Sequence, residues 1–581
     1  MTCETNSVVL ENTDSPRLRK NSKILLIVIL LVAAILRLIN LRISPPGLNQ
    51  DEASNAWSAY CLLETGKDHA GASWPVYYTR GLGGNNTTLY MYMIIPFQAI
   101  GGLNIYTTRL PAAFCGIFAV WLIYYVAKKL FNTDTGLAAA ALLALNPWHL
   151  QLSRWGQESS IAPLLGLVPL AGMLWANLPV GNNKSDSPRP IIAGISGILA
   201  GIGCFGYHSV RLFVPIFIFA LVIFNLPLWW RTLRTKKGAL ATALFVLGFT
   251  AIFGQLLYLH IFHPEGIGRH AAFQRWVGSA GLIDSLKHFS LRYIQHFGLD
   301  FLFIRGDHFI MQGPAIGGEY HWYELPLMIA GAIAVLGKFK SSASLRTVAA
   351  YVVLFPTGDS FGWGLWGLHA LRSAPGLCAL TLLSAVGLIA AVKWFWKQNP
   401  NNTKIGIIAF ALIAIGLNTR FLYHFFGEFN RRPAVYHLYH TDLTEACDWL
   451  KPHFDDFDAV YVTTLGLNMP YVVTAVALNY DPNRWFSEPI EISTATTLGI
   501  ENASEWDFYT RYGKMHFIYD YTNFSILELQ KKFAPGRLLF ILRPDEYSVL
   551  AKMENIENPT RYVVHRIIGP ENSDVLWLCR F

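Results

Sequence analysis

Long apolar runs separated by short polar connections constrain the fold of this chain more than any other feature of its sequence. We count about eleven of them, most near the length that a helix needs to cross a bilayer. They are Ile24–Leu41, Arg109–Val126, Gly136–Leu150, Ile161–Val180, Ile191–Tyr207, Leu212–Trp230, Ala239–Phe262, Leu325–Gly337, Val348–Pro356, Ala374–Ala391 and Ile405–Leu422. Hydrophobic residues make up 53% of the 581 residues and charged residues only 14%, unlike a soluble domain. The sequence therefore predicts a polytopic α-helical membrane protein.

Basic residues indicate the orientation of these spans. Four of them, between Arg17 and Lys23, precede the first span, and further Lys and Arg clusters recur at every second connection. Because basic residues mark the cytoplasmic side, we expect residues 1–23 to be a cytoplasmic N-terminal segment. The basic clusters fall on alternate connections only if a shorter apolar stretch, Leu89–Ile100, lies in the membrane interface and does not cross the membrane.

This orientation places the long polar segments outside. The membrane core then covers residues 24–422, with a first outer loop at 42–108 and a large outer loop at 263–324. The tail, residues 423–581, has a different composition and would form a separate outer domain.

Within the tail, the patterns of helix and strand alternate. Asp442–Pro452 is typical of an amphipathic helix and Ala459–Thr464 of a strand, and Leu527–Phe533 followed by Gly536–Leu542 repeats that pair. We therefore expect a small α/β domain of roughly 150 residues.

The seven cysteines are spread singly, without the paired spacing typical of zinc sites. The sequence therefore predicts no structural zinc site. Cys447 and Cys579 share the tail, and are either a disulfide in an oxidising compartment or two unrelated buried thiols.

Asp51 and Glu52 directly follow the first span, where its helix would emerge into water. A carboxylate at a membrane surface is well placed to accept a proton from a hydroxyl group, if its surroundings suit that task. The alternative is that this pair is a solvated turn or that Asp51 begins a helix, since aspartate is a good N-cap.

Further polar residues accumulate at the expected outer ends of the spans. They are Arg154, Glu158, His208, Arg211, Asp307, His308, His369 and Arg372. Arg and His suit a phosphate group, and carboxylates suit a sugar or its attacking hydroxyl. Each of them, taken alone, is also compatible with an anchor at the membrane interface.

With these motifs the chain resembles the polyprenyl-phosphate-dependent membrane glycosyltransferases of the C-type superfamily, near the protein O-mannosyltransferases and the lipid A aminoarabinose transferases. The resemblance covers roughly residues 24–425 and rests on a set of short motifs. These are Asp51-Glu52-Ala53, the run Arg109-Leu110-Pro111-Ala112-Ala113-Phe114-Cys115-Gly116, Asn146-Pro147-Trp148, Arg154 with Glu158, Arg305-Gly306-Asp307, and His369-Ala370-Leu371-Arg372.

The resemblance implies transfer of a sugar from a polyprenyl-phosphate donor to an acceptor hydroxyl on a lipid, a protein or a polysaccharide. Asp51 would be the general base, and Glu52 or Glu158 would hold sugar hydroxyls or help to place a divalent metal ion. In a prokaryote the protein would lie in the cytoplasmic membrane, with its site on the outer face.

Arg211, His208, His369 and Arg372 would hold the departing phosphate. His208 and His369 each lie three residues before one of these arginines, a spacing that puts both members of a pair on one helix face.

Two other functions are compatible with many spans. A flippase or transporter of lipid-linked sugars should carry ionisable residues deep within its spans, whereas here the charges lie at span ends. A receptor whose tail binds a ligand would not need about eleven spans. The basic residues lie mainly between spans, so the net charge of +8 does not suggest a nucleic-acid partner.

Overall fold

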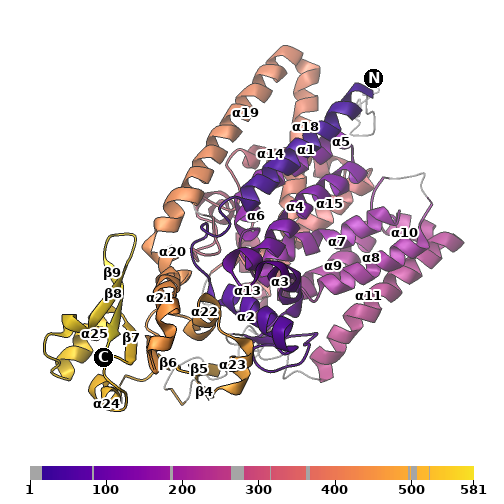
Figure 1. The fold of residues 1–581 in the computed structure, drawn as a ribbon. Coiled ribbons are helices and arrows are strands. Elements are labelled where there is room, and N and C mark those ends of the chain that lie inside the picture. Colours follow the sequence, from indigo (N-terminus) through magenta and orange to yellow (C-terminus); the bar gives the residue numbers. More distant parts are fainter. Residues whose placement is uncertain are drawn as a thin grey trace, which may run out of the picture. The chain divides into compact units, whose positions relative to one another are not determined.

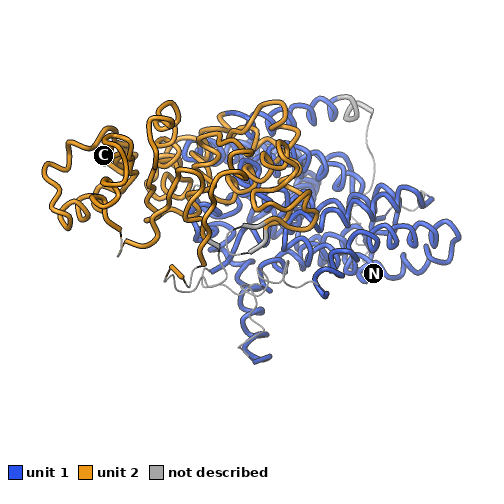
Figure 2. The backbone as a smooth tube through the Cα atoms, turned by 60° about the horizontal axis from the view of Figure 1, so that its bottom comes forward, with its two compact units in different colours: residues 1–39, 112–263, 274–425 blue, residues 40–111, 264–273, 426–581 orange. Residues whose placement is uncertain are grey.

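The structure is a computed structural model (Figure 1). It describes residues 16–81, 84–182, 187–262, 281–314, 316–361, 367–494, 497–498, 507–521 and 524–581, so parts of both large outer loops lie outside the described residues. The chain divides into two compact units (Figure 2). Unit 1 is built from residues of the segments 1–39, 112–263 and 274–425, and unit 2 from residues of 40–111, 264–273 and 426–581.

Six helical segments among the described residues are long and apolar enough to cross a membrane. They are Asn21–Leu38 within α1 (Pro16–Leu38), Ile105–Leu130 (α4), Glu158–Trp175 (η1, Glu158–Ile161, and α7, Ala162–Trp175), Lys236–Phe262 (α11), Ala370–Gln398 (α17, Ala370–Ser373, to α18, Leu377–Gln398), and Pro400–Arg431, which begins with α19 (Pro400–Tyr423). A seventh candidate is the pair α9 (His208–Phe224) and α10 (Leu226–Leu233), which is bent by 84°. A helical membrane fold is thereby confirmed.

The other predicted spans fall on shorter helices. These are α5 (Thr133–Leu145), α8 (Pro190–Gly203), α14 (Glu324–Lys338) and α15 (Ala343–Leu354). Each predicted span thus overlaps a helix, although Leu212–Trp230 falls on the bent pair α9 and α10, and Gly136–Leu150 continues from α5 into α6 (Pro147–Leu152). The number of eleven crossings stays a prediction. The stretch expected in the interface forms α3 (Thr88–Gly101).

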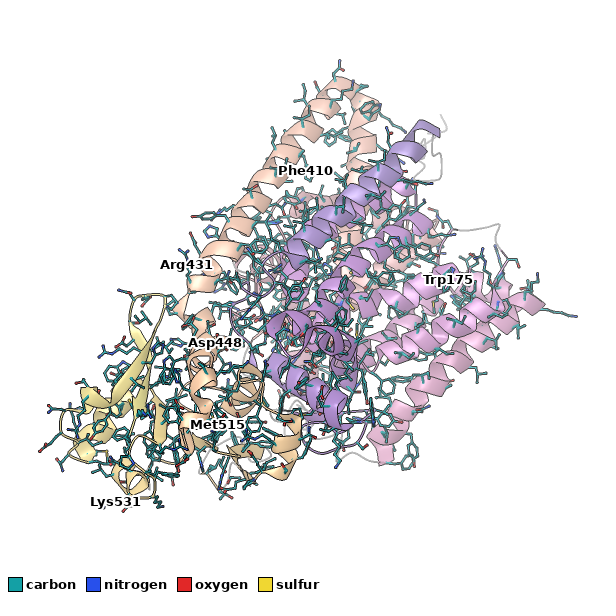
Figure 3. All side chains as sticks on the ribbon, viewed as in Figure 1. Trp175, Phe410, Arg431, Asp448, Met515 and Lys531 are labelled. Atoms are coloured by element: carbon teal, nitrogen blue, oxygen red, sulfur yellow. The ribbon has the colours of Figure 1, made fainter. Side chains whose placement is uncertain are left out.

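The surfaces of the long helices differ according to their neighbours. In the first half of α18, residues 377–387, all residues are buried against other helices. In contrast, α19 exposes large apolar side chains such as Ile408 and Leu412 along its length (Figure 3, where Phe410 marks this helix). An apolar surface of this kind is stable only against hydrocarbon or protein. The exposed face of α19 therefore fits contact with lipid.

The tail forms a seven-stranded sheet in the order β4-β5-β6-β3-β7-β9-β8. The strands are β3 (Ala459–Thr463), β4 (Ile490–Thr494), β5 (Asp507–Tyr512), β6 (Met515–Ile518), β7 (Leu538–Leu542), β8 (Val563–Ile568) and β9 (Asp574–Arg580). The central strand β3 is parallel to β6 and β7, and the outer pairings are antiparallel.

Alternating side chains of the central strands enter two separate cores. Val460 of β3 packs in one core with residues of α21 (Thr441–His453) and α22 (Pro470–Ala477). Ala459, its neighbour, packs in the other core with residues of α24 (Ile526–Gln530) and α25 (Pro544–Met553). Helices therefore cover both faces, as a sheet with parallel central strands requires. The predicted helix and strand patterns in the tail are confirmed.

The six described cysteines are free and buried. Cys447 lies in the core on one face of the sheet and Cys579 in the core on the other. Of the two interpretations of this pair, the second is therefore correct: Cys447 and Cys579 are separate buried thiols and do not form a disulfide.

Candidate functional site

Asp51 lies in the first turn of α2 (Gln50–Thr65), within unit 2. The N-cap of this helix is Asn49, whose side chain accepts a hydrogen bond of 3.0 Å from the backbone N–H of Asp51. Asp51 is therefore not the cap itself, and its side chain is half-buried. The partial positive charge of a helix N-terminus favours the ionised carboxylate, which is the form that can accept a proton.

Glu52 is in a different environment from its neighbour. Its two carboxylate oxygens accept hydrogen bonds of 2.7 and 2.8 Å from Arg109, and neither side chain is exposed. Oε2 also accepts from the backbone N–H of Asn49, completing a capping box. The predicted part of Glu52 in the reaction, holding sugar hydroxyls or helping to place a metal ion, stays a prediction, and this geometry favours a role in holding α2 in place.

Arg109 also fixes the chain that leads from the first span to α2. Its guanidinium donates to the backbone carbonyl oxygens of Leu41, Pro45 and Gly47, at 2.7–3.0 Å. One buried arginine thus ties segment 41–47 and the first turn of α2 together. Asp51 is held by this network, although Arg109 lies far from it in sequence.

Residues of the tail support α2 from the other side. Gly47 has a positive φ of 56°, and a methyl group there would overlap the carbonyl oxygen of Tyr439. Trp57 of α2 packs edge-on against Trp485, with ring centroids 5.3 Å apart. The first outer loop and the tail therefore form one packed body within unit 2.

The second group of predicted residues lies in unit 1, around a buried carboxylate that the sequence did not single out. Asp359, in α16 (Thr357–Ser360), accepts two hydrogen bonds of 2.8 and 2.9 Å from Arg292. It also accepts one of 3.0 Å from the backbone N–H of His369. His296 Nε2 lies 3.3 Å and Arg372 Nη1 4.0 Å from its oxygens. Burial opposes ionisation, but His296, Arg292 and His369 hold the pKa of Asp359 well below its usual range.

His296 places its ring between this carboxylate and the backbone of α13. Its Nδ1 lies 2.7 Å from the carbonyl oxygen of Arg292, which can only accept a hydrogen bond, so Nδ1 carries a proton. The guanidinium groups of Arg292 and Arg372 carry more positive charge than the single carboxylate of Asp359 can neutralise.

Close helix packing brings further predicted residues to this group. A methyl group at Gly358 would overlap the carbonyl oxygen of Arg372 and come within 3.2 Å of Ser209 Cβ, so α16 is pressed between α17 and the start of α9. The start of α9 carries His208 and Arg211, whose Nδ1 and Nη1 are 3.3 Å apart. Two pairs predicted from the sequence, His208 with Arg211 and His369 with Arg372, thus meet at α16.

Glu158 belongs to the same region. It begins η1, which contacts α17, and it acts electrostatically on Arg211. Glu158 is buried, so it supplies a carboxylate beside the positive charges.

Asp307 and His308 reach this region from the large outer loop. Asp307 Oδ2 accepts a hydrogen bond of 2.7 Å from the N–H of Ala370, and Oδ1 accepts one of 2.8 Å from Phe309. Burial raises the pKa of Asp307 to about 7, and burial also raises that of Glu319, whose Oε1 accepts from the Asp307 N–H. His308 is exposed, beside Gly367. Asp307 therefore fastens this loop to the start of α17.

Arg154 is the exception among the predicted residues. Its guanidinium donates hydrogen bonds of 2.7 Å each to the carbonyl oxygens of Leu36 and Ile39, at the end of α1. Its substrate-binding role stays a prediction, since these bonds favour the capping of a helix end.

Several nitrogen atoms of this group are buried without a hydrogen-bond partner among the described residues. They are Nη2 of Arg211, Nε of Arg292 and Nδ1 of His369, whereas Nε2 of His296 has only its 3.3 Å contact with Asp359. Burial and the neighbouring charge of Arg372 lower the pKa of His369 to about 3, so its ring is neutral and can donate or accept. Buried donors beside excess positive charge are typical of an anion-binding site. No group of three or more His, Cys, Asp or Glu residues suited to a metal ion occurs in the described part of the chain.

Comparisons with known proteins show what the chain is similar to. Residues 85–253, which include Arg154, Glu158, His208 and Arg211, match the family model described as dolichyl-phosphate-mannose-protein mannosyltransferase. The fold is similar to that of ArnT from Cupriavidus metallidurans in the apo state, at 13% identity, with a TM-score of 0.56 and coverage of 97% of this chain and 98% of that one. The predicted resemblance to the C-type membrane glycosyltransferases is confirmed.

A second structure of the same ArnT, bound to undecaprenyl phosphate, matches with a TM-score of 0.51, 14% identity, and coverage of 96% of this chain and 98% of that one. No curated protein matches the sequence significantly. The family match and the shared fold together bear out the predicted class of enzyme, a glycosyltransferase embedded in the membrane.

Proposed function

We propose that this glycosyltransferase moves one sugar from a polyprenyl-phosphate donor to an acceptor hydroxyl, and that both reactants meet it on the outer face of a prokaryotic cytoplasmic membrane. The observation that carries the proposal is the group of buried, unpartnered nitrogen atoms around Asp359. A phosphate would supply the missing acceptors and balance the positive charge. The likeness to a fold that was solved with undecaprenyl phosphate supports this chemistry.

In the proposed reaction Asp51 accepts the proton of the attacking hydroxyl. The hydroxyl oxygen forms the new bond to the anomeric carbon, and the bond from that carbon to the phosphate oxygen breaks. The polyprenyl phosphate leaves with the bonding electron pair, and such a single displacement inverts the anomeric centre.

The negative charge of the leaving phosphate is stabilised by Arg211 and Arg372, with His208 and His369 as further donors. Among the described residues, Arg372 makes only a long contact of 4.0 Å with Asp359. Arg292 is instead engaged with Asp359 through two short hydrogen bonds. The first two arginines are therefore the better candidates for direct contact with phosphate.

A flippase of lipid-linked sugars is the alternative function. It would use the same anion site but would form no new glycosidic bond. The match of residues 85–253 to a mannosyltransferase family favours the enzyme.

The test is transfer by the purified protein in lipid nanodiscs, supplied with a panel of radiolabelled polyprenyl-phosphate sugars and with lipid, peptide and polysaccharide acceptors. We expect a labelled product and release of free polyprenyl phosphate. Movement of intact donor across a vesicle membrane, without product, would instead identify a flippase.

The proposed orientation has its own test. A reporter that is active only outside the cytoplasm, fused after Phe581, should be active. Activity of a cytoplasmic reporter at that position would contradict an outer location of unit 2 and of Asp51.

A further inference from the structure

The helix α13 (Leu282–Gln295), in the large outer loop, has its polar and apolar faces reversed relative to a helix in water. The side chains that it buries are polar, namely Ser285 and Arg292, and His296 just beyond its end is buried as well. Its exposed side chains are mostly large and apolar, including Leu282, Ile283, Leu286, Leu291 and Ile294. A surface helix of a soluble protein shows the opposite arrangement.

The polar face of α13 has a clear partner. Arg292 binds both oxygens of Asp359, and His296 lies beside the same carboxylate. The helix therefore cannot rotate its apolar face inward without breaking this buried ion pair. Ile283 is 82% exposed and Ile294 66% exposed, and on a helix these two side chains lie on nearly the same side.

The chemistry of the exposed face identifies what covers it. Water does not stabilise a face on which five large Leu and Ile side chains are exposed, and Ser290 and Lys287 are the polar residues among them. The long helices α11 and α19 of the same unit expose the same residue types and are long and apolar enough to cross a bilayer. One basic residue, Lys287, lies on the apolar side of α13 and is long enough to reach the lipid headgroups.

We propose that α13 lies in the membrane interface with its apolar face in bilayer hydrocarbon, and that it forms the lipid-side wall of the cationic group around Asp359. A phosphate carried on a lipid then meets Arg292 and its neighbours without leaving the bilayer. The placement of α13 is independent of the reaction, and only the lipid-linked donor rests on the proposed function.

The direct test is the accessibility of single cysteines in lipid nanodiscs. Ile283→Cys and Ile294→Cys are made in a protein in which Cys3 is replaced by Ser, since the six described cysteines are buried. The control is Met553→Cys in α25, because Met553 is an apolar residue of similar exposure, 73%. A charged thiol reagent in water should modify both α13 cysteines about tenfold or more slowly than the control.

A bimane probe at the same positions distinguishes the occupants. It should be quenched by nitroxide-bearing lipid at 283 and 294 but not at 553. Modification by the charged reagent at the control rate would show that the face meets water. Slow modification without quenching would show that protein covers it. Either result overturns the proposal.

A second measurement links α13 to the donor. Ile294→Asp places a charge in hydrocarbon, which is costly, and should shift the helix that carries Arg292. We expect KM for the lipid-linked donor to rise about tenfold with KM for the acceptor unchanged, and Met553→Asp to have no effect. An unchanged donor KM in Ile294→Asp would overturn the link, whereas absence of transfer in the unmodified protein would contradict the proposed function and leave the labelling result standing.

Discussion

Arg109 donates hydrogen bonds of 2.7 and 2.8 Å to the two carboxylate oxygens of Glu52, and neither side chain is exposed to solvent. The adjacent Asp51 lies in the first turn of the same helix and is half-buried. The two neighbouring carboxylates of one motif therefore have different surroundings. Glu52 holds the first outer loop, and Asp51 is the carboxylate that we propose as the base.

The first prediction concerns this pair. Glu52→Gln removes the negative charge and leaves Arg109 buried without compensation, so the free energy of unfolding should fall by about 3–5 kcal/mol. The measurement is thermal unfolding of the purified protein. Asp51→Asn is the matched control and should unfold close to the unmodified protein. Equal unfolding temperatures for Glu52→Gln and the unmodified protein would show that the pair does not stabilise the loop.

The second prediction concerns the donor phosphate. Arg211→Lys and Arg372→Lys keep the charge but lose the forked geometry that suits phosphate. At least one of them should weaken binding of undecaprenyl phosphate by about tenfold, measured by equilibrium binding in nanodiscs, with acceptor KM little changed. Arg231→Lys, at an exposed arginine of α10, is the control. Unchanged affinity in both variants would reduce Arg211 and Arg372 to anchors at the membrane surface.

The third prediction uses the close approach at Gly358. Ala at this position would overlap the carbonyl oxygen of Arg372 and displace α17 from α16. Because a shift of this kind moves Arg372 and His369, donor affinity should fall about tenfold or more. Gly337→Ala in α14, where a methyl group meets open space, should leave binding unchanged. Normal donor binding by a folded Gly358→Ala protein would show that this packing does not set the site.

The fourth prediction concerns pH. Burial raises the pKa of Asp307 to about 7, above its unfolded value of about 3.9. Its contribution to stability is thus fully present below pH about 4 and is lost as pH rises to about 7, by about 1.4 kcal/mol per pH unit. Asp307→Asn does not titrate, so its unfolding temperature should vary less with pH across this window. Parallel curves for the two proteins would contradict the raised pKa.

The membrane core could be predicted because hydropathy is a local property. Every predicted span overlaps a helix, and the alternation of patterns in the tail indicated a small α/β domain. The association of the first outer loop with the tail could not be predicted. It depends on contacts such as Gly47 with Tyr439 and Trp57 with Trp485, between residues that are hundreds of positions apart and carry no shared motif.

The group of basic residues around Asp359 was predictable only in part, again because some of its signals are local in the sequence and others are not. The pairs His208–Arg211 and His369–Arg372 lie at the ends of apolar runs, so they are recognisable from the sequence. Asp359 lies in a short polar connection, and its main partner Arg292 is 67 residues away. The spacing of Arg292 and His296, four residues apart on one helix face, was the available signal. This spacing could not be recognised as a buried polar face, because the apolar residues of α13 are the ones that are exposed.

In the proposed reaction, everything depends on Asp51 accepting the proton of the attacking hydroxyl. Asp51→Asn keeps the size of the side chain and much of its hydrogen bonding, but the amide cannot act as a base at neutral pH. The decisive measurement is the initial rate of sugar transfer by this variant in nanodiscs, with undecaprenyl phosphate binding and unfolding temperature measured on the same sample. We predict a rate lower by roughly a hundredfold or more, with both other properties unchanged. Transfer near the normal rate by the folded variant would contradict the assignment of Asp51 as the base.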